Sequence, residues 1–135
     1  MNNNIEIVDK YVPNEDVGSY FYKSDVLILP YTSATQSGPI QIAYNFNTPV
    51  ICSDVGGLPE LVENNKTGFV VPSKDPKALA DSIVKFYKNN RKKEFSDNIK
   101  KLKNKYSWKH YCDIIESLWF ILLYDVTLFF PLFLL

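Results

Sequence analysis

The chain has 135 residues, and its 15 Lys and Arg balance its 15 Asp and Glu, so the formal net charge is zero. Hydrophobic residues make up 46% of the sequence and aromatic residues 15%, which excludes a disordered chain and allows one domain with a packed core. A zero net charge argues against nucleic acid as the main partner, because phosphate backbones attract proteins with a basic surplus.

The N-terminal residues lack a basic start followed by an apolar run, so we expect no signal peptide and a cytoplasmic protein. Cys52 and Cys112 lie far apart and follow no metal-binding or redox spacing. We therefore expect two reduced thiols and no bound metal.

The first predicted elements alternate between strand and helix. An apolar run predicts a short strand at residues 5–8, and a helix follows that begins near Asn14, whose side chain can cap it. The apolar face of this helix holds Val17, Tyr20 and Phe21. Residues 26–29 form a continuous apolar run, which is typical of a strand covered on both faces of a parallel sheet.

The stretch of residues 31–60 is the centre of the predicted fold. It holds a polar loop at residues 35–38, a helix that begins near Pro39, a strand at residues 50–53 and a second glycine loop. Strand, small-residue loop, helix and strand make one βαβ unit, in which ligands bind at the carboxyl ends of the strands and against the start of the helix. The buried residues of its helix should be Ile40, Ala43 and Tyr44, with Phe46 as a further candidate.

The second half of the chain predicts four more helices and one strand. A short helix at residues 58–62 precedes a strand at residues 69–72, and Asp75 caps a helix whose first residue is Pro76. The lysines of residues 91–105 predict a helix with a solvated face, in preference to an anion or membrane patch. A last helix at residues 108–118 contains His110, for which we expect a packing or surface role. Together these elements predict an α/β class with a Rossmann-like parallel sheet and flanking helices.

The two glycine loops predict an anion-binding site. Gly38 lets a ligand approach the backbone closely, Thr35 and Ser37 offer hydroxyl groups, and the amides at the start of the following helix carry partial positive charge. A tight turn explains one glycine before a helix equally well. Gly56 and Gly57 at the end of the neighbouring strand favour a cleft, because they add a second loop beside the first.

The same stretch carries a resemblance to a known family. PVICSDVGGLPELV at residues 49–62 is similar to a signature of the retaining GT-B glycosyltransferases of the group 1, or family-four, type. The flanking strings resemble the motifs of that family in the same order, and the match runs from about residue 5 to residue 118. These strings are SDVLILP at residues 24–30, NKTGFVVP at residues 65–72, DPKALA at residues 75–80 and YSW at residues 106–108.

The resemblance implies that residues 1–118 are part of the C-terminal, nucleotide-sugar-binding domain of a two-domain transferase. Such enzymes transfer a hexose from a UDP-, GDP- or ADP-sugar with retention of configuration, and need no metal or other cofactor. The implied donor-binding residues are Thr35, Gln36, Ser37, Gly38, Pro39, Gln41, Gly56, Gly57 and Glu60. No catalytic residue is assigned.

Two departures from the family pattern affect the expected activity. The positions of a glutamate pair in the family hold Ala34 and Ile42 here, so Gln36 and Gln41 are the nearest polar substitutes. The acceptor domain and the basic residues that hold the diphosphate in the family are absent from these residues. We therefore expect the chain alone to be inactive or nearly so, since positioning both substrates is a large part of catalysis.

Residues 119–135 are almost wholly apolar and form a separate tail in the prediction. About 17 apolar residues is the lower limit for a membrane span, and Asp125 and Pro131 disfavour one. An extension without a role, a peripheral membrane contact at the inner face and a partner-binding segment remain open.

Three functions stay open from the sequence. The first is the donor-binding half of a glycosyltransferase. The second is a non-catalytic module that works beside a separate acceptor-domain chain. The third is a different nucleotide-binding α/β protein, such as a sugar epimerase.

Overall fold

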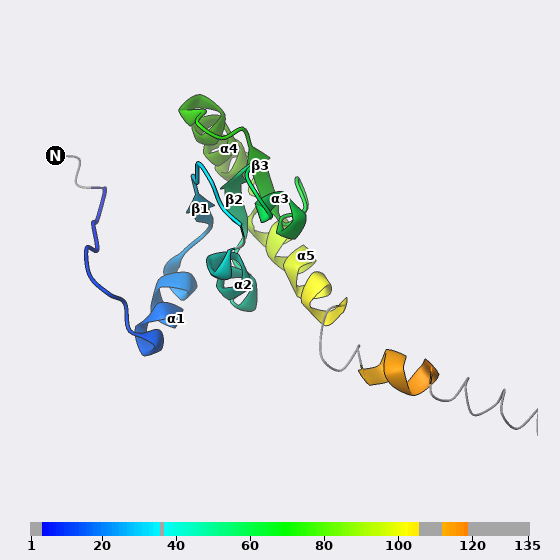
Figure 1. Ribbon diagram of the computed structural model, residues 1–135. Coiled ribbons are helices and arrows are strands. Elements are labelled where there is room, and N and C mark those ends of the chain that lie inside the picture. The colour runs from blue at the N-terminus through cyan, green and yellow to red at the C-terminus, as the bar shows by residue number, and fades with distance from the viewer. Residues whose placement is uncertain (1–3, 36, 106–111, 119–135) are drawn as a thin grey trace, which may run out of the picture.

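The computed structural model describes residues 4–35, 37–105 and 112–118 (Figure 1). The elements are, in chain order, α1 (Asn14–Lys23), β1 (Leu27–Leu29), α2 (Gly38–Asn45), β2 (Val50–Ser53), α3 (Leu58–Leu61), β3 (Gly68–Val71), α4 (Pro76–Lys88) and α5 (Lys92–Lys105). Residues 112–118 are also helical. The alternation of helices and strands confirms the predicted α/β class.

The three strands form one sheet in the order β1-β2-β3, and both pairs are parallel. Ile51 of β2 lies opposite Ile28 of β1 and Phe69 of β3. Because the strands are parallel, the loops that follow β1 and β2 leave the sheet at the same edge. This geometry is what brings the two glycine loops together.

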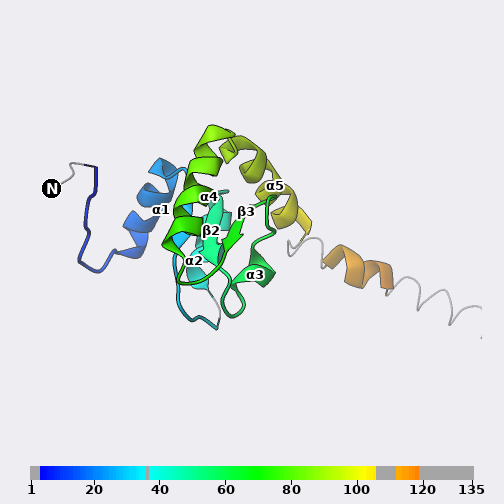
Figure 2. The same cartoon turned by 90° about the horizontal axis from the view of Figure 1, so that it is seen from above.

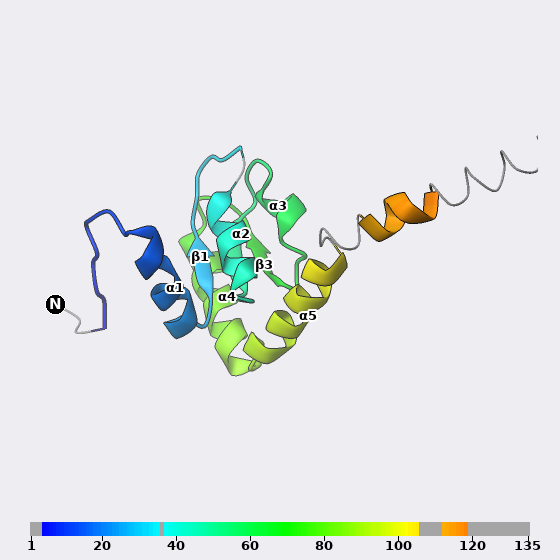
Figure 3. The same ribbon diagram turned by 90° about the horizontal axis from the view of Figure 1, so that it is seen from below.

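Helices cover both faces of the sheet (Figures 2 and 3). One core cluster packs under α2 and α3, and the other packs under α4. The first contains Leu29, Ile40, Ala43, Tyr44, Val50, Cys52, Leu58, Val62 and Ile99, and the second contains Ile51, Phe69, Phe86 and Phe95. α5 contributes to both clusters, through Ile99 and Phe95.

Burial differs between β1 and β2. Every residue of β2 is buried, as expected for a strand with neighbours on both sides and helices on both faces. In β1 only Leu29 is buried, while Leu27 and Ile28 are half-buried. The continuous apolar run of β1 therefore does not mark a fully covered strand, because β1 lies at an edge of the sheet.

Two local predictions are wrong. Residues 5–8 form no strand, and Ile5 and Ile7 are 74% and 83% exposed, because no strand of the described sheet pairs with them. The N-cap of α1 is Pro13, and Asn14 is the first helical residue, so its side chain cannot cap. Glu15 and Asp16 in the first turn instead complement the positive end of the helix dipole.

The other predicted helix starts are confirmed. Pro39 lies in the first turn of α2, and Ile40, Ala43 and Tyr44 are buried, whereas Phe46 is half-buried. Asp75 caps α4, since its Oδ1 accepts a hydrogen bond of 2.9 Å from the amide of Ala78. The lysine-rich helix α5 is present, with Phe95 and Ile99 buried on its inner side.

The last predicted helix is described in part, at residues 112–118, where Ile114, Ile115 and Leu118 are exposed. His110 and the apolar tail at residues 119–135 lie outside the described residues. Within the described ranges, no helix combines the length and the apolar character that a membrane crossing requires.

Candidate functional site

The two predicted glycine loops contact each other at the carboxyl edge of the sheet. The amide of Gly57 donates a hydrogen bond of 3.2 Å to the carbonyl oxygen of Thr35. A Cβ on Gly57 would lie 2.8 Å from that oxygen, and a Cβ on Gly56 would lie 1.6 Å from the carbonyl oxygen of Ala34. Gly56 also has a φ of +53°, which disfavours any other residue. Glycine is therefore required here for the contact between the loops.

A groove of about 440 Å³ lies between these loops and the start of α2. It brings together six of the nine predicted site residues: Thr35, Ser37, Gly38, Gln41, Gly57 and Glu60. Leu61 of α3 also lines it, although the sequence offered no signal for that residue beyond its place next to Glu60. Pro39 and Gly56 do not line the groove, and Gln36 lies outside the described residues.

Gly38 differs from Gly56 and Gly57 in its surroundings. A Cβ added to Gly38 would meet no atom within 4 Å. The fold therefore has no packing reason for glycine at this position, which lines the groove and begins α2. An open backbone at the start of a helix is what a closely approaching anion would need.

The N-terminus of α2 carries a positive dipole end that no side chain compensates. Ser37 is the N-cap residue, but its side chain makes no capping bond, and the first turn contains no acidic residue. The other helices from α1 to α5 all have such compensation. α1, α3 and α5 have Glu15 with Asp16, Glu60 and Glu94 in their first turns, and α4 has the Asp75 cap. No side chain of the described residues therefore competes with an anion for the start of α2, where Gly38 is exposed.

The hydroxyl of Ser37 is buried without a partner. Ser37 is 4% exposed, and its Oγ makes no hydrogen bond with any described residue. Leaving a buried polar group unpaired costs about 1–3 kcal/mol, so such groups in folded proteins usually have a partner. Its place in the lining of the groove makes a bound ligand a natural partner.

A second hollow of about 580 Å³ adjoins the groove and shares Gln41, Glu60 and Leu61 with it. Its further lining residues are Tyr44, Asn45, Glu63, Leu102 and Lys103. The last two come from α5, which sequence reasoning placed at the surface without a role. Lys103 Nζ donates to the carbonyl oxygen of Asn45 at 2.9 Å and to Asn47 Oδ1 at 3.3 Å, at the negative end of α2.

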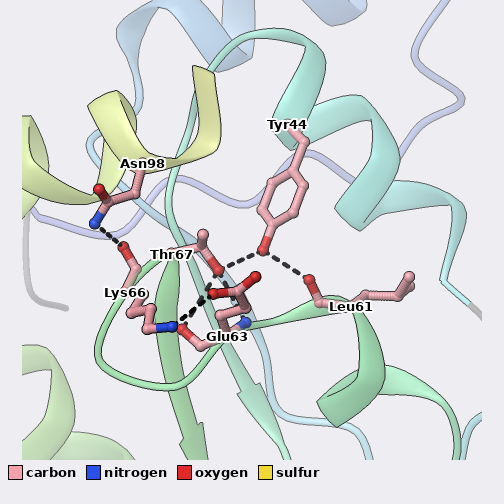
Figure 4. A network of polar contacts seen from close by, with 6 residues as sticks. All are labelled: Tyr44, Leu61, Glu63, Lys66, Thr67 and Asn98. Carbon is pink, nitrogen blue, oxygen red and sulfur yellow. Dashed lines mark hydrogen bonds and ion pairs between the residues drawn. The ribbon is translucent and has the colours of Figure 1, made fainter. Parts of the chain in front are cut away.

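A buried hydrogen-bond network fixes the wall that α2 and α3 form (Figure 4). The Tyr44 hydroxyl donates to the carbonyl oxygen of Leu61 at 3.0 Å and lies 2.7 Å from Thr67 Oγ1. Thr67 Oγ1 accepts from the amide of Glu63 at 3.0 Å. Burial raises the pKa of Tyr44 to about 12, although the bond to Thr67 opposes the shift. These hydrogen bonds therefore hold α2 and α3, which line the groove, at a fixed distance from each other.

The described residues contain no group of three or more His, Cys, Asp or Glu side chains that could hold a metal ion. Cys52 is fully buried in β2, and this burial raises its pKa to about 11. Its thiol therefore stays protonated at neutral pH and belongs to the core.

The family described as "Glycosyl transferases group 1" matches residues 1–89 of the chain. The chain belongs to this family. Membership accounts for the resemblance seen at residues 49–62. It also favours a glycosyltransferase over the epimerase that the sequence had left open.

Curated relatives of the chain include two bacterial biosynthesis glycosyltransferases. The chain is 34% identical over 80 residues to the putative teichuronic acid biosynthesis glycosyltransferase TuaC of Bacillus subtilis, a match over 59% of this chain and 20% of TuaC. It is 30% identical over 81 residues to the amylovoran biosynthesis glycosyltransferase AmsK of Erwinia amylovora, over 56% of this chain and 20% of AmsK. The chain thus spans about a fifth of the length of these relatives.

Solved structures agree on the fold. Sucrose-phosphate synthase from Thermosynechococcus elongatus superposes with a TM-score of 0.66 at 24% identity, over 84% of this chain and 29% of that enzyme. HepE from Anabaena, solved in complex with UDP, gives a TM-score of 0.63 at 19% identity, over 76% of this chain and 30% of HepE. These neighbours are GT-B glycosyltransferases, so the three-stranded sheet with its helices is a GT-B-type α/β unit.

The two positions that depart from the family's glutamate pair lie outside the groove lining. Ala34 is half-buried beside the glycine pair, and Ile42 is 38% exposed on α2. Gln41, the neighbouring residue, does line both hollows. A polar side chain, that of Gln41, is therefore present on α2 at the groove. It lies one position before Ile42, where the family pattern has a glutamate.

Proposed function

We propose that this chain is the donor-binding part of a retaining glycosyltransferase that uses a UDP-, GDP- or ADP-hexose. The observation that carries the proposal is the meeting of the two glycine loops at the uncompensated N-terminus of α2. Such a site suits the diphosphate of the donor, because exposed amides with partial positive charge bind phosphate oxygens.

Each lining residue has a role in this proposal. The amides at the start of α2 and the Ser37 hydroxyl bind the diphosphate, and Gly38 keeps the approach open. Gln41 and Glu60 bind hydroxyl groups of the ribose or the hexose, since an amide and a carboxylate both accept hydrogen bonds from hydroxyls. Membership of the family and the UDP complex of HepE support the choice of ligand class.

The charge of the bound diphosphate is offset by the helix amides without a metal ion in this proposal. No Lys or Arg lines the groove among the described residues. The helix amides therefore offset only part of the negative charge of the diphosphate. We expect donor binding to be weaker than in a site with basic side chains.

The chain alone should not catalyse transfer. It spans about a fifth of the length of its relatives, and this proposal assigns the groove to the donor alone. Catalysis requires both substrates in a fixed geometry. The alternative is a non-catalytic donor-binding module that works with a separate acceptor-domain chain, and the Ala34 and Ile42 departures favour it over an intact enzyme. Membrane contact through residues 119–135 remains a prediction.

Calorimetric titration with UDP, GDP and ADP tests donor binding. Binding of at least one nucleotide is expected, and Ser37→Ala and Gly38→Ala should each weaken it by roughly tenfold, or about 1.4 kcal/mol. Gly18→Ala is the matched control, because Gly18 lies on α1 away from the groove and its added Cβ makes ordinary contacts. No heat with any of the three nucleotides, or equal weakening by the control, would refute the proposal.

A further inference from the structure

The charge of the chain is divided unevenly along its length. Residues 85–105 hold nine Lys and Arg but only two Asp and Glu, so this stretch has a formal charge of +7. Because the whole chain is neutral, the remaining residues together carry −7. Such a distribution can orient a protein toward an oppositely charged partner even though its net charge is zero.

α5 presents three of these lysines on the side opposite its core contacts. Phe95 and Ile99 are fully buried on the inner side of the helix. With 3.6 residues per turn, Lys93, Lys100 and Lys101 fall on the outer side, and all three are exposed. These three residues are called the lysine face below. α5 lies at the border of the described structure, so the side opposite its core contacts is turned outward (Figures 1 and 3).

Most of the charge of the lysine face is not compensated by the described residues. Lys93 and Lys101 form no ion pair with any of them. Lys100 Nζ lies 3.3 Å from Asp97 Oδ1, but both side chains are about half exposed, and ion pairs of this kind contribute little to stability. With Asp97 counted, the outer side of α5 keeps a surplus of positive charge.

The kind of basic residue favours a fluid anionic surface over a specific anion site. Eight of the nine basic residues in the stretch are lysines. The single arginine, Arg91, is already engaged, since its guanidinium pairs with Glu94 and lies over the ring of Phe95. A lysine ammonium is a compact charge on a flexible stem, so it adapts to many arrangements of headgroups, whereas planar recognition of one anion favours arginine.

Nucleic acid is the other large anionic partner, and α5 suits it less well. Single strands bind proteins through bases that stack on aromatic side chains beside a basic groove. Among the described residues of α5, no aromatic or other large hydrophobic side chain is exposed. A straight helix with lysines on one side instead fits a flat surface.

We propose that the lysine face of α5 docks this protein on a bilayer that contains anionic lipids. Each lysine near such a surface adds to the attraction, and Lys92 and Lys103 on the same helix add to it at longer range. None of these residues lines the donor groove, so docking and donor binding can be tested independently. Membrane contact through the apolar residues 119–135 is a separate prediction, and it would not require charged lipid.

Co-sedimentation of the full chain with lipid vesicles tests the docking. The chain should bind vesicles of phosphatidylcholine with phosphatidylglycerol, and bind vesicles of phosphatidylcholine alone far more weakly. Binding should fall as salt is added, because salt screens the attraction. The double variant Lys93→Glu with Lys101→Glu should weaken binding to the anionic vesicles by at least about tenfold. Lys93→Gln with Lys101→Gln, which removes charge without reversing it, should lose an intermediate amount.

The matched control is Lys74→Glu with Lys77→Glu. It changes the net charge of the chain as much as the first variant, at two exposed residues near the start of α4, the end of that helix away from α5. The control should bind anionic vesicles as the wild type does. All variants change exposed side chains, so their urea midpoints should stay near the wild-type value.

Four outcomes would overturn the proposal. The first is no binding to anionic vesicles, and the second is equal binding to neutral and anionic vesicles, which would assign the contact to apolar residues. The third is a loss of binding that the control shares or that both lysine-face variants lack. The fourth is tighter binding to a single-stranded RNA, lost in the lysine-face variants, which would assign the face to nucleic acid.

Discussion

Gly38 and Gly56 belong to the two loops that meet at the carboxyl edge of the sheet, yet their surroundings give them different roles. A Cβ on Gly56 would overlap the carbonyl oxygen of Ala34 at 1.6 Å, whereas a Cβ on Gly38 would meet nothing within 4 Å. Gly56→Ala should therefore destabilise the fold by about 2 kcal/mol or more through strain and overlap. Gly38→Ala should leave stability unchanged or raise it slightly, because alanine favours a helix.

Urea unfolding of the two glycine variants checks this difference. The urea concentration at the midpoint of unfolding should fall for Gly56→Ala and stay near the wild-type value for Gly38→Ala. Equal losses in both variants would show that Gly38 has a structural role, and its assignment to the ligand would lose its basis.

The raised pKa of Tyr44 leads us to expect a loss of folding stability at alkaline pH. Its pKa is raised from the ordinary value of about 10 to about 12 in the folded state, since burial disfavours the charged form. The unfolded chain therefore releases this proton first, and stability falls as pH rises from about 10 to about 12, by at most about 2–3 kcal/mol. The buried thiol of Cys52, with a pKa raised to about 11, adds a loss that begins about one pH unit lower.

The variant Tyr44→Phe separates the contribution of this hydroxyl. It should cost about 1 kcal/mol at neutral pH, because the bonds to Leu61 and Thr67 are lost. It should also lose less stability than the wild type between about pH 9 and pH 12. Urea unfolding at several pH values measures both effects, and an unchanged alkaline loss in the variant would contradict the assignment to Tyr44.

At the scale of elements, α1 is attached to the body mainly through aromatic contacts. It has no buried residue, and its contacts with α2 centre on the Phe46 ring between Phe21 and Tyr22. Phe46→Ala should therefore release α1 locally, with hydrogen exchange of its amides accelerated at least about tenfold, while the amides of β2 keep their protection. Uniform acceleration across both elements would show that α1 is part of the cooperative core.

α5 is an element whose position the sequence could not predict. Its lysine-rich composition predicts a solvated helix, and the exposed lysines agree, but Phe95 and Ile99 anchor it to both core clusters. This docking brings Leu102 and Lys103 to the hollow beside the donor groove. Such contacts join residues that are about sixty positions apart in sequence, and periodicity within one helix carries no information about its distant partners.

The elements around the groove were predictable for a physical reason. Pro39 and Asp75-Pro76 are local start signals whose effect depends on a few neighbouring backbone groups. The strand at residues 5–8 failed because a strand also needs a neighbour, which no local pattern guarantees. The meeting of six predicted residues in one groove follows from parallel pairing of β1 and β2, which the apolar runs and the helix between them did predict.

At the scale of the whole molecule, we expect donor binding without turnover. The purified chain, incubated with UDP-, GDP- and ADP-hexoses and a range of glycoside acceptors, should release no more nucleotide than a protein-free control. Turnover above that level would show that the groove and the elements around it already form a complete active site.

The most direct test of donor binding at α2 is a residue-resolved NMR titration of the labelled chain with UDP and GDP. The account predicts that the backbone amides of Gly38, Ile40 and Gln41, at the start of α2, shift together with that of Gly57, while amides of α4 on the opposite face stay in place. Shifts confined to other surfaces, or no shifts with either nucleotide, would contradict it.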